Sequence, residues 1–204
     1  MKRSSLPCAT DCFPMKLPPV ILASASPRRS ELLRKVVRDL EIVPPETPET
    51  QPEHLSPREA CMLNAYHKAR SLAKKFPDSL IIGADTEVYL DGKVFGKPRD
   101  RMDAERMLGE LEGREHQVIT GVCMIHLRRH IQRTFTDTTR VTFKALGADE
   151  IAEYLDQIDP LDKAGAYAIQ EHGELIVSKT DGSYSNVVGL PVERVKTELK
   201  RFAV

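Results

Sequence analysis

The 204-residue sequence has no tryptophan, no net charge and no long apolar run. Lysine plus arginine and aspartate plus glutamate number 30 each, so no overall field attracts nucleic acid. Any affinity for anions must therefore come from local clusters. A membrane span needs roughly 18 consecutive apolar residues. The composition thus argues against both a nucleic-acid partner and a membrane protein.

Cysteine is also scarce. The four cysteines stand at positions 8, 12, 61 and 123, without CxxC spacing and without the density of a disulfide framework. This pattern is typical of reduced thiols, and we expect an intracellular, cytoplasmic protein.

The first 19 residues contain prolines and show no hydrophobic periodicity, and we interpret them as a disordered leader. Residues 20–204 form the expected folded part. The whole chain of 204 residues is 41% apolar, which is ordinary for a globular enzyme. That length can bury one core, so we expect a single domain, with two lobes as an option.

The segment from Val20 to Leu33 predicts a short buried strand followed directly by a helix. Ser26 is a suitable N-cap and Pro27 a suitable first helical residue. Ser24, Arg28 and Arg29 stand beside the free N–H groups of this helix start, which favours phosphate binding. An ordinary turn with two solvated arginines is the alternative, and the motif by itself leaves both open.

Two further stretches carry candidate catalytic groups. A capping box at residues 56–59 starts a helix whose apolar arc has Lys68 at its edge. Residues 80–86 predict a short strand that ends on Asp85, and ligands bind beyond strand ends in open α/β sheets. A turn-initiating aspartate is the alternative for Asp85. Asp91-Gly92 predicts a hairpin that would return Lys97 to Asp85.

The remaining pattern alternates between helices and strands. It predicts helices near 101–112 and 149–158, strands at 116–127, 131–145 and 174–178, and a last helix with Val192, Val195, Leu199 and Phe202 on its apolar side. Alternating elements with antiparallel hairpins predict an α/β fold with a mixed sheet.

From about Leu17 to the last helix, the chain resembles the Maf family of nucleoside triphosphate pyrophosphatases. The blocks that carry the resemblance are Leu22-Ala-Ser-Ala-Ser-Pro-Arg-Arg29, His67-Lys-Ala69, Gly83-Ala-Asp-Thr86, Gly96-Lys-Pro98, Thr120-Gly121, Asp162-Lys-Ala-Gly-Ala-Tyr-Ala-Ile-Gln170 and Asn186-Val-Val-Gly-Leu-Pro191. No single block identifies the family by itself, but the order and spacing of all the blocks together are specific to it.

The resemblance implies an elongated two-lobed fold, similar to that of inosine triphosphate pyrophosphatases, with the active cleft between the lobes. It implies hydrolysis of a nucleoside triphosphate to the monophosphate and pyrophosphate. The implied cofactor is a divalent cation, usually Mg²⁺ with Mn²⁺ as an alternative, and the implied assembly is a homodimer.

By position, the resemblance assigns roles to particular residues. Asp85 corresponds to the proton acceptor, and Lys68 and Lys97 to cations that neutralise developing charge. The triphosphate would be bound by Ser24, Arg28 and Arg29, and the metal by Glu49 and Asp85. The family usually has aspartate where Pro48 stands, and Glu46 has the same Glu-Thr-Pro setting, so Glu46 remains an alternative to Glu49.

Three positions follow the substrate division within the family: Arg28, Thr86 and Gln170. All three match the branch that acts on dTTP and UTP, whereas the 7-methyl-GTP branch has Trp, Gln and Glu there. We therefore expect a dTTP/UTP pyrophosphatase. The alternatives are a pyrophosphatase for 7-methyl-GTP or another modified nucleotide, and a nucleotide-binding regulator of cell division with little turnover.

Overall fold

The structure is a computed structural model that describes residues 16–48, 50, 52 and 54–203. Most of the expected leader lies outside the described residues, so its disorder stays a prediction. Glu49, the expected loop ligand for the metal, also lies outside them.

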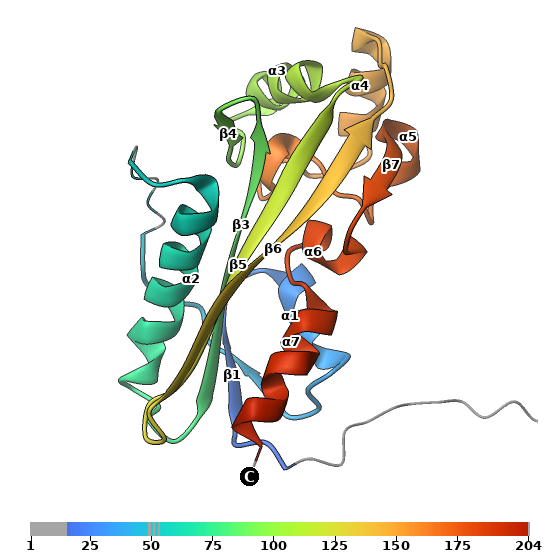
Figure 1. Ribbon diagram of the computed structural model, residues 1–204. Coiled ribbons are helices and arrows are strands. Elements are labelled where there is room, and N and C mark those ends of the chain that lie inside the picture. Colours follow the sequence, from blue (N-terminus) through green and yellow to red (C-terminus); the bar gives the residue numbers. More distant parts are fainter. Residues whose placement is uncertain (1–15, 49, 51, 53, 204) are drawn as a thin grey trace, which may run out of the picture.

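A seven-stranded mixed sheet forms the centre of the fold (Figure 1). Its strands are β1 (Val20–Ala23), β2 (Leu40–Ile42), β3 (Leu80–Leu90), β4 (Lys93–Phe95), β5 (Glu115–His126), β6 (Ile131–Phe143) and β7 (Val177–Asp181). β1 pairs in parallel with β2 and β3, whereas β3, β5, β6 and β7 pair antiparallel in that order. The expected mixed sheet is confirmed.

Seven α-helices and two 3₁₀ turns cover the sheet in the described part of the chain. They are α1 (Pro27–Arg34), α2 (Pro57–Ala73), α3 (Arg101–Leu111), α4 (Ala148–Leu155), η1 (Ala164–Ala166), α5 (Gly173–Ile176), α6 (Tyr184–Val188), α7 (Val192–Leu199) and η2 (Lys200–Phe202). Figure 1 shows α2 on one side of the long strands, α1 and α7 on the other, and α3 and α4 near the far end. None of the helices in this part of the chain combines the length and the apolar composition that a bilayer crossing requires.

Two separate hydrophobic cores lie along one face of the long strands. Near the β1 end, Leu22 and Ile82 pack with α1 and α7, and near the β4 end, Val88 and Phe95 pack with α3 and α4. Alternate residues of a strand share a face, so Thr86 lies on this face between the two cores. A polar zone therefore interrupts the apolar face at the middle of β3, in accord with a two-lobed molecule.

One edge of β3 is open at the same level. β1 ends at Ala23 opposite Gly83, and β4 begins to pair only at Val88. Between them, residues 84–87 pair with β5 on one side and with no described strand on the other. Side chains from both faces of β3 can therefore reach one shared space at this gap.

Helix α2 packs directly on the opposite face of the sheet because two glycines there have no side chain to hold it away. A Cβ atom at Gly83 would lie 2.4 Å from the carbonyl oxygen of Ala65, and one at Gly121 would lie 2.4 Å from the carbonyl group of Cys61. Both distances are far below van der Waals contact. The two glycines therefore set how closely the polar side chains of α2 approach β3.

The structure corrects several local predictions. Asp85 does not end a short strand, because β3 continues for five more residues to Leu90. The expected strand at 174–178 is wrong in its first half, since residues 173–176 form the one-turn helix α5 and β7 follows. The short helix α6 was not predicted. The capping box at Ser56 and the Asp91-Gly92 hairpin are confirmed.

Candidate active site

A cavity of about 490 Å³ opens at the gap beside β3. Eight of the residues singled out in the sequence line it: Ser24, Arg28, Arg29, Lys68, Asp85, Thr86, Lys97 and Gln170. They come from the loop after β1, from α1, α2 and β3, and from segments that follow β4 and η1. Glu46, the alternative loop carboxylate, is exposed and does not line the cavity.

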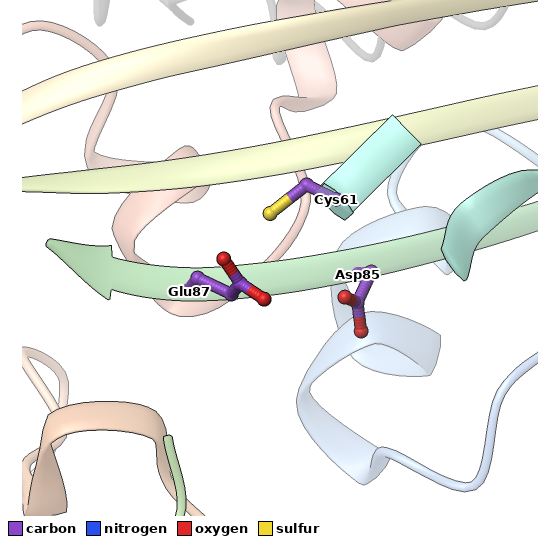
Figure 2. Close-up of side chains that lie close together, drawn as sticks. All are labelled: Cys61, Asp85 and Glu87. Carbon is purple, nitrogen blue, oxygen red and sulfur yellow. The ribbon is translucent and has the colours of Figure 1, made fainter. Parts of the chain in front are cut away.

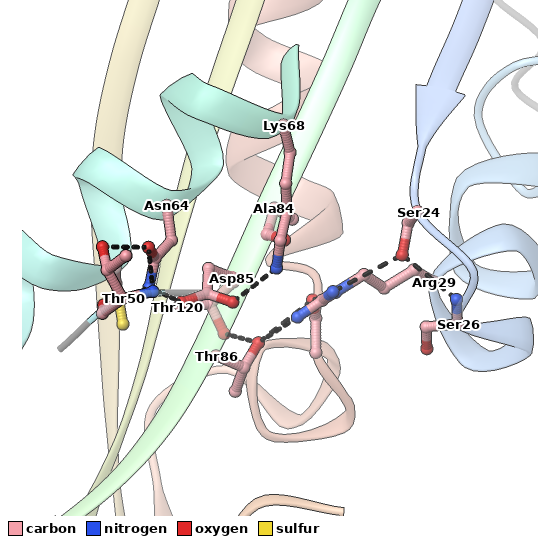
Figure 3. Close-up of polar contacts among 12 residues, drawn as sticks. Ser24, Ser26, Arg29, Thr50, Asn64, Lys68, Ala84, Asp85, Thr86 and Thr120 are labelled. Atoms are coloured by element: carbon pink, nitrogen blue, oxygen red, sulfur yellow. Dashed lines mark hydrogen bonds and ion pairs between the residues drawn. The ribbon is translucent and has the colours of Figure 1, made fainter. Parts of the chain in front are cut away.

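Asp85 is held by two side chains of α2. Its Oδ1 lies 2.7 Å from Lys68 Nζ, and its Oδ2 accepts a 2.9 Å hydrogen bond from Asn64 Nδ2. All three side chains are buried. Asn64 and Lys68 are four residues apart, so they lie on the same face of α2, one turn from each other. This arrangement fixes the carboxylate of Asp85 in a single orientation at the cavity wall (Figure 3).

Asn64 also anchors the proline-rich loop. Its Oδ1 accepts a 3.1 Å hydrogen bond from the backbone N–H of Thr50, and its Nδ2 donates to the Thr50 carbonyl at 2.9 Å. Thr50 follows Glu49 directly in the sequence. The side-chain amide of Asn64 thus links this part of the loop to the carboxylate of Asp85.

Arg29 extends from α1 toward the middle of β3. Its Nη2 donates to Thr86 Oγ1 at 2.9 Å, its Nε to the Gly189 carbonyl at 2.9 Å, and its Nη1 to Ser24 Oγ at 3.4 Å. Gly189 has a φ of 125°, a conformation that favours glycine. Arg29 therefore connects the loop after β1, strand β3 and the segment after α6 at one point.

Arg28 is paired across the cavity. Its Nη1 lies 2.7 Å from Asp162 Oδ2, and its Nη2 donates to the Asp162 carbonyl at 3.2 Å. The other carboxylate oxygen of Asp162 accepts from the buried Lys163 at 2.8 Å. Burial raises the pKa of Asp162, but the hydrogen bonds from Lys163 and Arg28 outweigh it and the net pKa lies below the ordinary value.

A second carboxylate lies beside Asp85. Glu87 is buried on the same face of β3, and its carboxylate, the Asp85 carboxylate and Cys61 Sγ lie within 4.8 Å of one another. Figure 2 shows these three side chains close together. Burial raises the pKa of Cys61 strongly, and its thiol donates to the Ile119 carbonyl. Cys61 therefore remains a protonated thiol, and the carboxylates are the hard oxygen donors of this group.

The cavity lining also includes a set of apolar residues. This set consists of Val88, Val118, Leu161, Ala164, Tyr167, Ala168 and Val187, and the uncharged Gln170 lines the cavity as well. The hydroxyl of Tyr167 lies 2.9 Å from Nε2 of buried His116. Burial lowers the pKa of His116 to about 4, so its ring is neutral near pH 7. By chemistry, the lining residues thus fall into a charged set, called the charged half below, and an uncharged set, called the uncharged half.

Sequence reasoning missed Asn64, Glu87, Asp162 and Lys163 as lining residues. The spacing in the sequence could have indicated two of them, Asn64 and Glu87. Asn64 stands one helical turn before Lys68, and Glu87 stands two residues after Asp85 on the same strand face. Asp162 and Lys163 belong to a block that the resemblance had already marked, but their sequence gives no sign of the contact with Arg28.

Comparison with known proteins agrees with this architecture. The family described as Maf-like protein matches residues 19–202. A dTTP/UTP pyrophosphatase of Carboxydothermus hydrogenoformans is 46% identical over 183 residues, which cover 90% of this chain and 98% of that protein. A dTTP/UTP pyrophosphatase of Bacillus velezensis is 46% identical over 186 residues, covering 91% and 97%. One from Akkermansia muciniphila is 44% identical over 180 residues, covering 88% and 94%. With a match across nearly its whole length, this chain belongs to the Maf family.

Proposed function

We propose that this chain hydrolyses dTTP and UTP to the nucleoside monophosphate and pyrophosphate. The observation that carries the proposal is the cavity itself, where a fixed, buried carboxylate lies among clustered cationic side chains. The names of its relatives support the same substrates.

The charged half suits a triphosphate. Its cationic lining residues are Arg28, Arg29, Lys68, Lys97 and Lys163, and its carboxylates are Asp85, Glu87 and Asp162. Negative oxygens shield the α-phosphorus from a nucleophile, so attack requires their neutralisation. We assign Ser24, Arg28 and Arg29 to binding the phosphates. Lys68 and Lys97 neutralise the charge that develops during the reaction.

Asp85 is the proposed proton acceptor. The contacts with Lys68 and Asn64 orient its carboxylate and leave lone pairs for a water molecule. Asp85 would orient this water toward the α-phosphorus and accept its proton as the bond to pyrophosphate breaks. Lys68 Nζ, at 2.7 Å from Asp85 Oδ1, forms an ion pair with this carboxylate and keeps it beside the site of attack.

The donor set fits a divalent cation that prefers oxygen ligands. Asp85 offers a carboxylate at the cavity wall, Glu87 offers a second one beside it, and the protonated Cys61 thiol is a poor ligand for Mg²⁺. We propose that Asp85 holds the cation together with Glu49 of the loop that Asn64 anchors. When bound, such a cation supplies charge neutralisation at the phosphates.

The uncharged half suits a nucleobase. Its apolar wall can exclude water from the faces of a base, and Gln170 can donate and accept hydrogen bonds at its edge. We propose that Arg28, Thr86 and Gln170 set the preference for pyrimidine nucleotides.

A panel of nucleotides tests the proposal. Pyrophosphate and orthophosphate release are measured separately with Mg²⁺ and dTTP, UTP, CTP, GTP or 7-methyl-GTP. We expect pyrophosphate from dTTP and UTP at least tenfold faster than from GTP and 7-methyl-GTP. Preference for 7-methyl-GTP would contradict the substrate assignment. Tight binding of dTTP without release of either product would instead favour a nucleotide-binding regulator.

A further inference from the structure

We propose that Thr120, a buried residue of β5 to which the proposed function gives no task, is a positioning residue for Arg29. The inference rests on the proposed function, because it concerns how the same site binds phosphate. Thr120 is paired with Thr86 in the register of β3 and β5. Its side chain is fully buried and does not line the cavity. Any effect of Thr120 on a nucleotide must therefore pass through a neighbour.

The neighbour is Thr86. The two hydroxyl oxygens lie 3.0 Å apart, and Arg29 Nη2 lies 2.9 Å from Thr86 Oγ1 (Figure 3). Thr120 Oγ1 also lies 3.1 Å from the Asn186 carbonyl oxygen. A continuous chain of contacts therefore runs from Asn186 through both hydroxyls to the guanidinium of Arg29.

The direction of each hydrogen bond in this chain is determined. A carbonyl oxygen only accepts, so Thr120 donates its single hydroxyl proton to the Asn186 carbonyl. The bond between the hydroxyls must then use the proton of Thr86. Guanidinium only donates, so Thr86 must present a lone pair to Arg29, and all of these requirements are met together.

Removing the hydroxyl of Thr120 changes what Thr86 does. Its proton then has one remaining acceptor nearby, the Gly189 carbonyl at 3.5 Å, which already accepts from Arg29 Nε. A rotation of Thr86 toward Gly189 would turn its lone pairs away from Arg29 and compete for that carbonyl. One substitution at a buried residue outside the cavity would thus weaken two hydrogen bonds that orient Arg29, those to Thr86 and Gly189.

This link explains how Thr86 can affect substrate choice. Thr86 is a branch-specific position in the resemblance, and in the structure its hydroxyl is engaged by Arg29 and Thr120. We infer that Thr86 acts through the orientation of Arg29.

The test compares Thr120→Val with Thr120→Ser, which retains the hydroxyl. Binding of a non-hydrolysable α,β-imido analogue of dTTP is measured by calorimetry, and kcat and KM are measured with dTTP. We expect Thr120→Val to weaken analogue binding and raise KM about fivefold, with kcat within twofold. Thr120→Ser should remain within twofold of the native chain in all three.

Thr139→Val is the matched control. Thr139 is also a fully buried threonine on a long strand, and its hydroxyl bonds Asn186 Nδ2 and Ser183. It does not line the cavity, and it contacts the side-chain amide of Asn186 and not the Asn186 carbonyl that accepts from Thr120. Thr139→Val should lower the thermal midpoint about as much as Thr120→Val and leave analogue binding unchanged.

A double-mutant cycle with Arg29→Lys tests whether Thr120 affects nucleotide binding through Arg29. Lysine cannot reproduce the guanidinium fork, so Thr120→Val should weaken analogue binding less than twofold further in that background. An undiminished fivefold effect there, or equal loss of binding in Thr139→Val, would overturn the inference. A native chain that binds the analogue but releases no pyrophosphate from dTTP would contradict the proposed function, and the binding comparison would still decide the role of Thr120.

Discussion

Lys68 and Asp85 form a buried ion pair, with 2.7 Å between Nζ and Oδ1 and about 7% of each side chain exposed. Lys68 and Asp85 are 17 residues apart in sequence, and Gly83 and Gly121 let α2 lie against the sheet where the two side chains meet. Removing the two charges from water costs free energy, and the attraction between the paired side chains offsets this cost. The site therefore depends on both residues for stability as well as for chemistry.

Breaking this pair on one side should destabilise the fold. Lys68→Met leaves the Asp85 carboxylate buried without its direct cation, and we expect the free energy of unfolding to fall by about 3 kcal/mol. Adding Asp85→Asn removes that charge and should restore more than half of the loss. Urea unfolding measures both variants, and equal stability of the single and the double variant would contradict this account.

The close approach of α2 predicts a sharp difference between glycines. Gly121→Ala would place a Cβ 2.4 Å from the backbone of Cys61, and we expect a loss of about 3 kcal/mol. Because α2 must shift, dTTP turnover should fall too. Gly109 lies within α3 with open space around it, so Gly109→Ala should be neutral or stabilise by up to about 1 kcal/mol. Thermal unfolding of the two variants decides the matter, and similar midpoints would refute the packing argument.

His116 predicts a specific loss of stability in acid. Burial lowers its folded pKa to about 4 from an ordinary value near 6.5. Between these values the unfolded chain binds a proton that the folded chain does not, so stability falls as the pH drops from about 6.5 toward 4. The contribution from pH 7 to pH 5 is about 2 kcal/mol.

Substitution by a residue that does not titrate should remove this dependence. His116→Gln is less stable at pH 7, but its stability should change less between pH 7 and pH 5 than that of the native chain. His130→Gln, in the exposed turn between β5 and β6, serves as the control and should keep the native profile. Parallel profiles for all three proteins would exclude His116 as the source.

The Arg28–Asp162 pair predicts an effect on substrate binding. Asp162 holds the guanidinium of Arg28 through its carboxylate and its carbonyl, while Lys163 compensates the carboxylate charge. Asp162→Asn weakens this hold, and we expect KM for dTTP to rise about threefold to tenfold with kcat nearly unchanged. Asp181→Asn, which breaks an exposed pair with Arg140 away from the cavity, should change neither value. A lower KM in Asp162→Asn would mean that Asp162 competes with the substrate.

Local patterns in the sequence predicted most of the helices and strands because the signals themselves are local. Ser56 caps α2, Asp91-Gly92 turns the hairpin, and Val195 and Leu199 bury one side of α7. The strand predicted at residues 174–178 is wrong in its first half, because a short apolar run fits either a strand or a helical turn. The structure resolves it as one turn of α5 before β7.

The site needed tertiary information that no local pattern contains. Asp85 was expected at the end of a short strand, but it lies within β3 at a gap between β1 and β4, and only the strand register reveals that gap. Lys68 was placed near Asp85 by the resemblance alone. Arg28 and Asp162 are 134 residues apart, and nothing in either segment indicates their contact.

The most direct test of the account is the fate of oxygen when dTTP is hydrolysed with Mg²⁺ in ¹⁸O-labelled water. Attack of water on the α-phosphorus places the label in dTMP and leaves pyrophosphate unlabelled. We predict this outcome for the native chain, and a loss of at least a thousandfold in rate for Asp85→Asn with binding of the imido analogue retained. Label in pyrophosphate or orthophosphate, or an Asp85→Asn variant as fast as the native chain, would contradict the proposed reaction and its base.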